Sequence, residues 1–532
     1  MKAFLVIIIF SMPIRGEWFS SFSHMEKLLG KEADLLKSLS DYITYENSRL
    51  NYLEEALKIM NTTSCSSASN VRACMENPIN QYALMKRLAY VWEGVRSAVS
   101  DRNASEKFLW TIDRNRPTLP TSLDVFGSIS GLIRIQLIYG ISAHDMALGI
   151  IGKSVSGISL SAGDCYDIGD VALANNQSQI CAEWQETALN KMRNGDNSIN
   201  AEKVLYLLAR CVYAHGNLPM AYETLREIAR FAPDFIEMAD FYRHVMAQAE
   251  QQKLAPFLGN FYGVLEKYAH EKPLKNHSLL EQLCQGKKPL TRIQGPPLRC
   301  YLWDGNRNPR LLFRPVKVEI ESKKPFVARL YNFISDDEIE ILKKVSSPLM
   351  YRAKVSNGES GGRESDSRVT KTVFLEEKRF EIVAKINRRV ADVTKFDSRY
   401  VEELSISNYG VGGHYDLHMD AFGIKAKEGQ NFENKGDRIA TLLMYLSDVD
   451  QGGNTVFPNL RIVAKPIKGS AILWFNLLTN GTIDRDSLHS GCPVMTGDKW
   501  IINLWVREKA ISTCSLCESR ICPENTHKMR FY

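Results

Sequence analysis

The stretch NYGVGGHYDLHMD, from Asn408 to Asp420, decides the fold of the C-terminal part of this chain. Its His418 and Asp420 are two residues apart, so on a β-strand their side chains lie on one face of the sheet. A third ligand from a neighbouring strand would complete a metal site, and His489 is the candidate. Two imidazoles and one carboxylate leave three positions open on an octahedral ion, as in non-haem Fe(II) oxygenases. A His-x-Asp pair alone also fits ordinary surface or capping residues.

A lysine follows the last of these candidate ligands. Lys499 lies ten residues beyond His489, in the stretch GDKWIINLW from Gly497 to Trp505. A cation there could pair with the far carboxylate of an oxoacid whose keto-acid end chelates the metal. Taken alone, Lys499 fits a solvated surface lysine better. Together with the three ligands it indicates a site for a metal and an oxoacid.

The sequence around this stretch predicts a sheet domain with flanking helices. Helices are indicated by Leu342–Val345 and by the apolar spacing from Phe380 to Val393. Ser356–Ser367 has almost no apolar residue and is predicted to be a mobile loop and a possible lid. Helices packed against a β-sandwich or jelly roll are the architecture that this pattern favours. The predicted strands are Leu404–Tyr409, Thr441–Leu446, Ile462–Lys465, Ser470–Phe475 and Trp500–Val506.

Residues 160–250 have helical periodicity. The stretch Ala201–Ala232 follows the tetratricopeptide spacing, which predicts Gly216 in a turn between two helices and Pro233 at the end of the second helix. Such helix pairs stack with a concave face that can hold an extended peptide. A plain helical linker domain is the alternative.

The N-terminal sequence has two features. Lys2, the apolar run Ala3–Phe10 and the small residue Gly16 predict a signal peptide over residues 1–16. From about residue 25 to residue 60, apolar residues recur at intervals of three and four residues, which predicts a helix with one apolar face. A packed hairpin within the chain and a coiled coil between chains both fit this pattern.

Composition bounds the class of protein. With 532 residues, the chain is long enough for two to four domains of roughly 100–200 residues each. Its 44% hydrophobic and 24% charged residues exclude collagen-like and disordered chains. A net charge of +6 without a Lys/Arg-rich block argues against a nucleic-acid partner. No later stretch has the roughly 18 uninterrupted apolar residues of a membrane span.

Cysteines and glycosylation sequons indicate the secretory pathway. Eleven cysteines are an odd number, so at least one is free or pairs with another chain. Cys65 and Cys74 could form a local disulfide, and Cys284 and Cys300 could close a sixteen-residue loop worth about 3 kcal/mol. The Asn-x-Ser/Thr sequons are at Asn61, Asn103, Asn176, Asn276 and Asn480.

The motifs together resemble the α subunit of collagen prolyl 4-hydroxylase. They are the NYGxGG stretch, the two histidines, the aspartate and the lysine, RIATLLMYLSD from Arg438 to Asp448, and GGNTVFP from Gly452 to Pro458. The resemblance implies an enzyme of the endoplasmic reticulum lumen that uses Fe(II), 2-oxoglutarate, dioxygen and ascorbate. It also implies a proline-rich or collagen-like substrate, a second α subunit and protein disulfide isomerase as the β subunit.

The resemblance assigns roles to residues of this chain. It implies iron ligation by His418, Asp420 and His489, and pairing of Lys499 with the distal carboxylate of 2-oxoglutarate. Tyr409 and Arg438 are further candidates for pocket contacts. Arg507 stands where the family often has a histidine, and a permanent cation can still pair with a carboxylate. The implied disulfides are Cys284–Cys300 and Cys492 with a tail cysteine, Cys514.

The expected fold is therefore α+β and multidomain, with an N-terminal helical or coiled-coil segment, a tetratricopeptide-like domain and a C-terminal double-stranded β-helix (jelly-roll) domain. The expected boundaries are a signal peptide at 1–16, a helical dimerisation domain at 17–140, a peptide-binding domain at 141–255, a linker at 256–320, a dioxygenase domain at 321–511 and a cysteine-containing tail at 512–532.

The expected peptide groove departs from the family. Of a row of family tyrosines only Tyr213 remains, and tyrosines stack on proline rings, so weaker Pro-Pro-Gly recognition is predicted. A non-catalytic peptide-binding or assembly subunit, or a dioxygenase with another substrate, are the alternatives. The altered positions are Leu207, Arg210, Glu237, Phe241 and His244.

Overall fold

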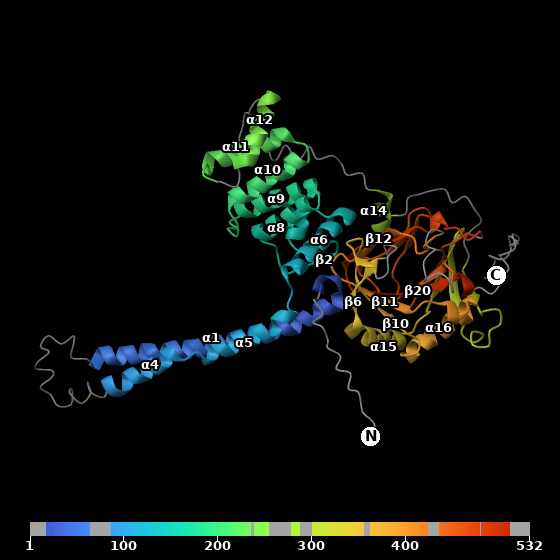
Figure 1. Cartoon of the computed structure of the whole chain (residues 1–532), viewed down its shortest axis with the longest axis horizontal. Helices are drawn as coiled ribbons and strands as arrows, with labels where there is room; N and C mark the ends of the chain where they lie inside the picture. The colour runs from blue at the N-terminus through green and yellow to red at the C-terminus, as the bar shows by residue number, and fades with distance from the viewer. Residues whose placement is uncertain are drawn as a thin grey trace, which may run out of the picture. The chain divides into compact units, whose positions relative to one another are not determined.

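The computed structural model of this chain is divided into two compact units (Figure 1). Unit 1 contains His24–Thr121, and unit 2 contains Glu17–Ser23 together with the chain from Ser122 onward. No helix among the described residues is long and apolar enough to cross a bilayer. The described residues are 17–63, 84, 87–235, 239–254, 278–287, 300–355, 362–423, 436–478 and 480–510.

Several features predicted from the sequence lie outside the described residues. They are the signal peptide at 1–16, the pair Cys65 and Cys74, Glu237, Asn276, residues 356–361 of the loop predicted at 356–367, and the tail with Cys514.

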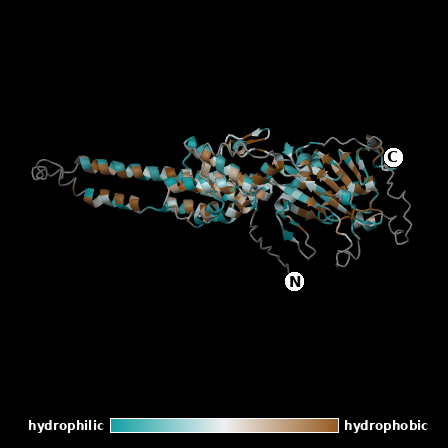
Figure 2. Cartoon of the chain, turned by 90° about the horizontal axis from the view of Figure 1, so that it is seen from above, coloured by the Kyte–Doolittle hydropathy of each residue, from teal (hydrophilic) through white to brown (hydrophobic). Residues whose placement is uncertain are grey.

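Unit 1 is built from long amphipathic helices that pack on one another within the chain. The rings of Tyr42 on α1 and Phe108 on α5 stack with centroids 5.5 Å apart, and Arg49 donates to the carbonyl of Ala98 at 3.3 Å. Hydrophobic and hydrophilic residues alternate along these helices (Figure 2). The helix predicted over residues 25–60 is therefore continuous, and its packing within the chain is one of the two arrangements that fit the sequence. The bounds are α1 (Phe22–Thr63), α4 (Trp92–Ser100) and α5 (Asn103–Asn115).

The first part of unit 2 contains a series of helices, of which α8 and α9, and α10 and α11, are joined by short turns. Gly216 lies between α10 and α11 with φ of +88°, a conformation that glycine adopts without strain, and this confirms its predicted turn position. The disulfide Cys181–Cys211 joins α9 to α10. The bounds are α6 (Ser122–Tyr139), α7 (Ala143–Ala147), α8 (Ala162–Ala174), α9 (Ser178–Arg193), α10 (Ala201–Ala214), α11 (Leu218–Phe231), α12 (Ala239–Gln251) and α14 (Leu279–Cys284).

The C-terminal part of unit 2 contains a nine-stranded sheet and a five-stranded sheet, each with antiparallel neighbours. In the large sheet the order is β3-β4-β5-β17-β13-β20-β11-β10-β6, and in the small sheet it is β16-β15-β18-β12-β9. The bounds in the large sheet are β3 (Cys300–Trp303), β4 (Val316–Lys323), β5 (Phe326–Tyr331), β6 (Tyr351–Arg352), β10 (Lys371–Leu375), β11 (Leu404–Tyr409), β13 (Arg438–Tyr445), β17 (Ala471–Phe475) and β20 (Lys499–Arg507). In the small sheet they are β9 (Arg368–Val369), β12 (His414–His418), β15 (Thr455–Phe457), β16 (Ile462–Ala464) and β18 (His489–Gly491).

The two faces of the large sheet have different neighbours because side chains alternate along each strand. On β13, Leu442 and Met444 belong to the core that includes α15 (Asp336–Ser346) and α16 (Glu381–Thr394). Leu443 and Tyr445 point to the other core, with Phe457 of the small sheet. The face of the large sheet that carries Leu443 and Tyr445 is therefore the one that faces the small sheet. The remaining strands are β1 (Ile150–Ile151), β2 (Ser154–Val155), β7 (Lys354–Val355), β8 (Arg363–Glu364), β14 (Gln451–Gly452) and β19 (Val494–Thr496).

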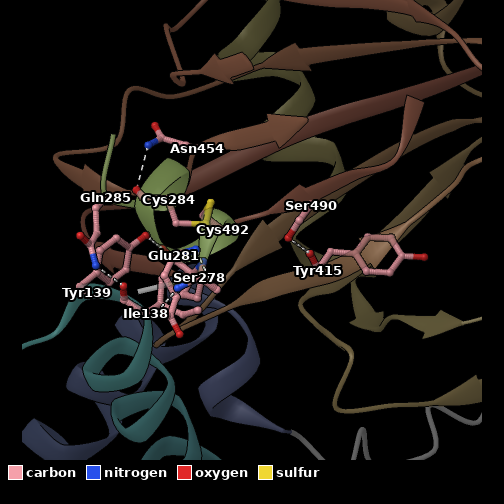
Figure 3. Close-up of a disulfide and its surroundings, with 11 residues drawn as sticks. Ile138, Tyr139, Ser278, Glu281, Cys284, Gln285, Tyr415, Asn454, Ser490 and Cys492 are labelled. Carbon is pink, nitrogen blue, oxygen red and sulfur yellow. Dashed lines mark hydrogen bonds between the residues drawn. A yellow bond between two sulfur atoms is a disulfide. The ribbon is translucent and has the colours of Figure 1, made fainter. Parts of the chain in front are cut away.

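The disulfide pairing differs from the expectation. Cys284 pairs with Cys492, with Cα atoms 5.6 Å apart, so the predicted pairs Cys284–Cys300 and Cys492–Cys514 are both wrong (Figure 3). The reason is packing: α14 lies against β15 and β16 of the small sheet, so Cys284 and Cys492 share one buried cluster. Cys300 instead begins the outermost strand of the large sheet, where its side chain is exposed and its thiol is free.

Candidate active site

Three predicted ligands meet between the two sheets. His418 ends β12 and His489 begins β18, and the two are directly opposite each other in this antiparallel pair. Asp420 follows β12, with Oδ1 3.7 Å from Nε2 of His418 and Oδ2 3.7 Å from Nε2 of His489. The candidate ligand atoms all lie within 4.8 Å of one another. The arrangement expected from the His-x-Asp spacing is therefore present.

Hydrogen bonds fix the orientation of each of these three side chains. Nδ1 of His418 lies 2.7 Å from the carbonyl of Asp416, and Nδ1 of His489 lies 2.9 Å from the carbonyl of Ser487. A carbonyl only accepts, so each Nδ1 carries the proton and each Nε2 keeps its lone pair for a metal. Backbone contacts of this kind leave no signal in the sequence.

The carboxylate of Asp420 has a hydroxyl partner that sequence reasoning missed. Thr441 Oγ1 on β13 donates to Oδ2 of Asp420 at 2.6 Å, and the amide of Asn476 donates to Thr441 Oγ1 at 2.9 Å. All three side chains are buried. These two linked hydrogen bonds fix the orientation of the Asp420 carboxylate through Oδ2, and the carboxylate can still bind a cation.

The charges at the site suit a divalent cation. Burial, with His489 beside it, lowers the pKa of His418 to about 3, so its imidazole is neutral near pH 7. Burial opposes ionisation of Asp420, but His489, His418 and Arg438 hold the pKa of its carboxyl below the usual value. A neutral imidazole and an ionised carboxylate are the forms that bind Fe(II), so the residues present fit that ion.

Lys499 lines the same cavity as the three candidate ligands. It begins β20, is 1% exposed, and burial lowers the pKa of its ammonium to about 7. Its Nζ lies 4.8 Å from the ring centroid of Tyr409, and no described acidic side chain is within ion-pair distance. A buried cation without a carboxylate needs an anionic partner. The cavity lining includes His418, Asp420, His489, Lys499, Tyr409 and Leu443.

Arg438 and Arg507 do not line this cavity with Lys499. Nε of each guanidinium lies 2.7 Å from the same carboxylate oxygen of Glu402. The guanidinium of Arg438 also covers the ring of Trp505 at 3.9 Å and lies 3.4 Å from the carbonyl of Asp420. The structure therefore brings Arg438 beside the backbone of Asp420, while Arg507 shares Glu402 with it and donates to the carbonyl of Gly436 at 2.9 Å. Glu402, which organises them, was missed from the sequence.

Tyr415 is another residue that sequence reasoning missed. Its ring stacks on His418 with centroids 3.5 Å apart, and the guanidinium of Arg368 lies 4.8 Å from the Tyr415 ring. The stacked ring covers His418 and limits the access of water to it.

The residues expected in a peptide groove do not all share one face. Tyr206, Arg210 and Tyr213 are spaced four and three apart on α10, so they lie on one side of the helix. Leu207 is turned by about 100° from Tyr206 and is 1% exposed, so its predicted place in the groove is wrong. The hydroxyl of Tyr213 lies 2.9 Å from Nε2 of His244. Rings of Phe241 and Tyr213 meet edge to face at 5.3 Å.

Comparisons with known proteins identify the family. Residues 21–153 match the model described as prolyl 4-hydroxylase alpha-subunit, N-terminal region, and residues 404–507 match that of the 2OG-Fe(II) oxygenase superfamily. A solved viral collagen prolyl hydroxylase from Paramecium Bursaria Chlorella virus-1 is 23% identical, with a TM-score of 0.28, and covers 34% of this chain and 95% of that one.

Full-length relatives are more similar. Prolyl 4-hydroxylase subunit alpha-2 of Gallus gallus is 31% identical over 523 residues, which are 96% of this chain and 97% of the relative. Subunit alpha-1 of Homo sapiens is 31% identical over 509 residues, which are 92% of this chain and 94% of the relative. At this identity and coverage, the chain belongs to the family of prolyl 4-hydroxylase alpha subunits.

Proposed function

We propose that this chain is the catalytic alpha subunit of a procollagen-proline 4-dioxygenase. It forms 4-hydroxyproline in collagen-like or other proline-rich secreted polypeptides, using 2-oxoglutarate and dioxygen and releasing succinate and carbon dioxide. One observation carries this proposal: a buried lysine without a described carboxylate partner lines the same cavity as His418, His489 and the ionised Asp420.

His418, Asp420 and His489 would hold Fe(II). When bound with 2-oxoglutarate and dioxygen, the iron supplies the oxidising chemistry that puts an oxygen atom into a proline C–H bond. The chain's own contribution is orientation. Thr441 and the two backbone carbonyls keep the ligand atoms aimed at one point, so little reorganisation is needed when the metal binds.

Lys499 would bind the distal carboxylate of 2-oxoglutarate. A carboxylate favours the charged ammonium, so a site with a lysine pKa of about 7 takes up a proton on binding when the solution is more alkaline. The ring of Tyr409 covers the ammonium, and Leu443 and Ile501 also line the cavity. These apolar walls exclude water and strengthen the ion pair.

Arg438 and Arg507 were candidates for direct contact with 2-oxoglutarate. Because both guanidinium groups pair with Glu402, we assign them instead to the support of Asp420. Two cations share the half-buried carboxylate of Glu402, and Arg438, one of the two, lies next to Asp420. Its positive charge helps to keep the aspartate ionised.

We assign residues 141–255 to a tetratricopeptide-like peptide-binding domain and residues 321–511 to a double-stranded β-helix. The helix pairs with Gly216 in a turn support the first assignment, and the two facing antiparallel sheets support the second. Aromatic rings of Tyr206, Tyr213 and Phe241 offer stacking surfaces for proline. Arg210 and His244 lie among them, which favours a proline-rich substrate other than plain Pro-Pro-Gly repeats.

A second alpha subunit is the proposed partner of unit 1. Besides the face of α1 that packs within the chain, an adjacent row of apolar side chains recurs every seven residues and is 48% to 66% exposed. A heptad repeat of this kind is the seam of a coiled coil between chains. The row consists of Leu29, Leu36, Ile43, Leu50 and Leu57.

The remaining proposals concern the compartment and the cofactors. We assign the chain to the lumen of the endoplasmic reticulum, with ascorbate as reductant and protein disulfide isomerase as β subunit. Two disulfides among the described residues support an oxidising compartment. Four described sequon asparagines are exposed and could carry glycans, namely Asn61, Asn103, Asn176 and Asn480.

The proposed function is tested with the full chain co-expressed with protein disulfide isomerase and supplied with Fe(II) and ascorbate. We expect 2-oxoglutarate decarboxylation that increases with a proline-rich peptide, and mass spectrometry should find one added oxygen atom on proline. The His418→Ala variant should lose both signals. Decarboxylation without peptide hydroxylation would move the substrate elsewhere, and neither signal would favour a non-catalytic assembly subunit.

A further inference from the structure

The N-terminal segment Glu17–Ser23 is part of the oxygenase unit although it lies almost 400 residues from the site in sequence. Ser20 and Ser21 are fully buried. The backbone amide of Trp18 donates to Oδ1 of Asp124 at 2.6 Å, and the side chain of Glu17 forms an ion pair with Arg352. The start of the segment is therefore held by residues of unit 2 that are remote in sequence.

Phe19 packs so closely on Gly410 and Gly127 that neither position has room for a side chain. The amide of Val411 donates to the carbonyl of Phe19 at 3.2 Å, directly after the NYG stretch. A Cβ atom on Gly410 would lie 1.9 Å from that carbonyl oxygen, and a Cβ on Gly127 would lie 2.3 Å from the Phe19 ring. Both glycines therefore permit the close approach of this segment.

The amide of Asn408 connects this segment to the cavity. Its Oδ1 accepts from Ser21 Oγ at 2.6 Å and from the backbone amide of Ser23 at 3.1 Å. Its Nδ2 donates to Asp498 Oδ1 at 2.7 Å and to the carbonyl of Lys499 at 3.3 Å. The amide of Ser23 can only donate and the carbonyl of Lys499 can only accept, so the orientation of Asn408 is fixed and all four of its hydrogen-bonding positions are used.

The hydrogen bonds of Asn408 connect the N-terminal segment to two residues of the cavity, Tyr409 and Lys499. Asn408 precedes Tyr409 on β11, and β11 pairs with β20 so that Tyr409 is opposite Lys499. Asp498 is held further by the indole of Trp500 at 2.7 Å. Asn408 therefore fixes the backbone at the start of β20, where Lys499 is the first residue.

We propose that Ser21 is a positioning residue for the 2-oxoglutarate pocket: through Asn408, the N-terminal segment holds Lys499 and Tyr409 in their binding geometry. The inference rests on the function proposed above for Lys499. Without the Ser21 hydroxyl, Asn408 loses the stronger of its two contacts to the segment, and the turn at Asp498 gains freedom. The pocket then binds its carboxylate ligand less well, although the metal ligands are unchanged.

The test uses the full chain in complex with protein disulfide isomerase, loaded with Fe(II) and kept anaerobic, with 2-oxoglutarate affinity measured by calorimetry. Ser21→Ala should weaken binding by about fivefold to twentyfold and raise the KM for 2-oxoglutarate to the same extent, with kcat within about twofold. Ser21→Thr, which keeps a hydroxyl, should restore most of the affinity. Fe(II) affinity should not change.

Ser20→Ala is the matched control. Ser20 is equally buried, but its hydroxyl donates to the carbonyl of Glu17 at 2.8 Å instead of to Asn408. Its 2-oxoglutarate affinity should stay within about twofold of the unmodified chain. Ser21→Ala added to Asn408→Ala should have no further effect, because Asn408 transmits the effect of Ser21.

Two outcomes would overturn the inference. Equal effects of Ser20→Ala and Ser21→Ala on affinity, or a lowered melting temperature of Ser21→Ala with unchanged affinity, would show that the segment is only structural. Lys499→Ala separates this failure from a failure of the proposed function. If Lys499→Ala weakens 2-oxoglutarate binding and Ser21→Ala does not, only the inference about Ser21 fails; if Lys499→Ala has no effect, the proposed role of the lysine fails first.

Discussion

His418 and His489 face each other across the antiparallel strands β12 and β18, with ring centroids 4.2 Å apart. Both rings present Nε2 to Asp420, the third candidate ligand. The orientation of the Asp420 carboxylate therefore has to be fixed as accurately as that of the two imidazole rings. The Thr441 hydroxyl supplies this direction.

The first prediction therefore concerns Thr441. Thr441→Val keeps the shape of the side chain and removes the hydroxyl, so Fe(II) affinity of the metal-free complex should fall by about tenfold or more in calorimetric titration. The control is Thr394→Val, since Thr394 is equally buried but its hydroxyl bonds to Val390 within α16. Equal metal affinity in the two variants would contradict the role of Thr441.

The second prediction concerns the pH dependence of 2-oxoglutarate binding. Burial lowers the pKa of Lys499 to about 7 in the free site, while a bound carboxylate favours the charged form. Above pH 7 the free site must take up a proton to bind, so affinity should fall with rising pH, by up to about tenfold per pH unit.

Lys499→Arg provides the comparison for this dependence. An arginine stays charged over the whole range, so whatever affinity the variant keeps should be nearly independent of pH between 6 and 8. A flat profile for the unmodified chain would show that Lys499 is fully charged in the free site.

The third prediction concerns acid stability at α15. Burial alone would raise the pKa of Glu338, but hydrogen bonds from Arg389, the Ser335 amide and Lys385 lower it to about 2. A carboxyl with a depressed folded-state pKa stabilises the fold above its unfolded pKa. That stability, about 2–4 kcal/mol, should be lost as the pH falls from roughly 4.5 towards 2.

Glu338→Gln should remove this contribution and flatten the acid limb of the unfolding curve. Denaturant unfolding at pH 7 should then show a loss of similar size, because Arg389 keeps a charge without its partner. Glu340→Gln, on the exposed side of the same helix, is the control and should change stability by less than about 0.5 kcal/mol.

Much of the oxygenase fold could be predicted from the sequence because its strands are strongly patterned. The five predicted strands are all present, and β11 has the predicted bounds, Leu404–Tyr409. The His-x-Asp spacing was informative for the same reason: the strand period of two fixes which side chains share a face. Prediction failed where a contact depends on tertiary packing between distant segments. The partner of Cys284 is set by how α14 meets the small sheet, and no local pattern records this.

The site shows the same division. Residues whose type alone states their chemistry, such as His489 and Lys499, could be found from the sequence. Thr441, Asn408 and Glu402 could not, because each acts through a hydrogen bond or ion pair to a residue that is remote in sequence. The position of Leu207 was misjudged because the sequence spacing does not tell which side of α10 faces the core.

The fourth prediction concerns assembly through α1. Leu36→Glu combined with Ile43→Glu places two charges in the exposed heptad row, so a pair of alpha subunits should dissociate, as measured by light scattering of the assembled complex. Ser40→Glu puts the same charge on a polar, exposed position of the helix and should leave the mass unchanged. A mass that does not respond to the double variant would place the subunit interface elsewhere.

The fifth prediction concerns the disulfide that joins α14 to the strand region of His489 (Figure 3). Peptide mapping without reduction should recover Cys284 linked to Cys492, and a Cys284–Cys300 peptide would contradict the structure. Cys284→Ala should cost about 2–5 kcal/mol of stability, because the bond closes a long loop and lies in a buried cluster. Cys300→Ala is the control, since this thiol is exposed and free, and it should leave the unfolding midpoint nearly unchanged. Because Cys492 lies three residues after His489, Cys284→Ala should also weaken Fe(II) binding, whereas Cys300→Ala should not.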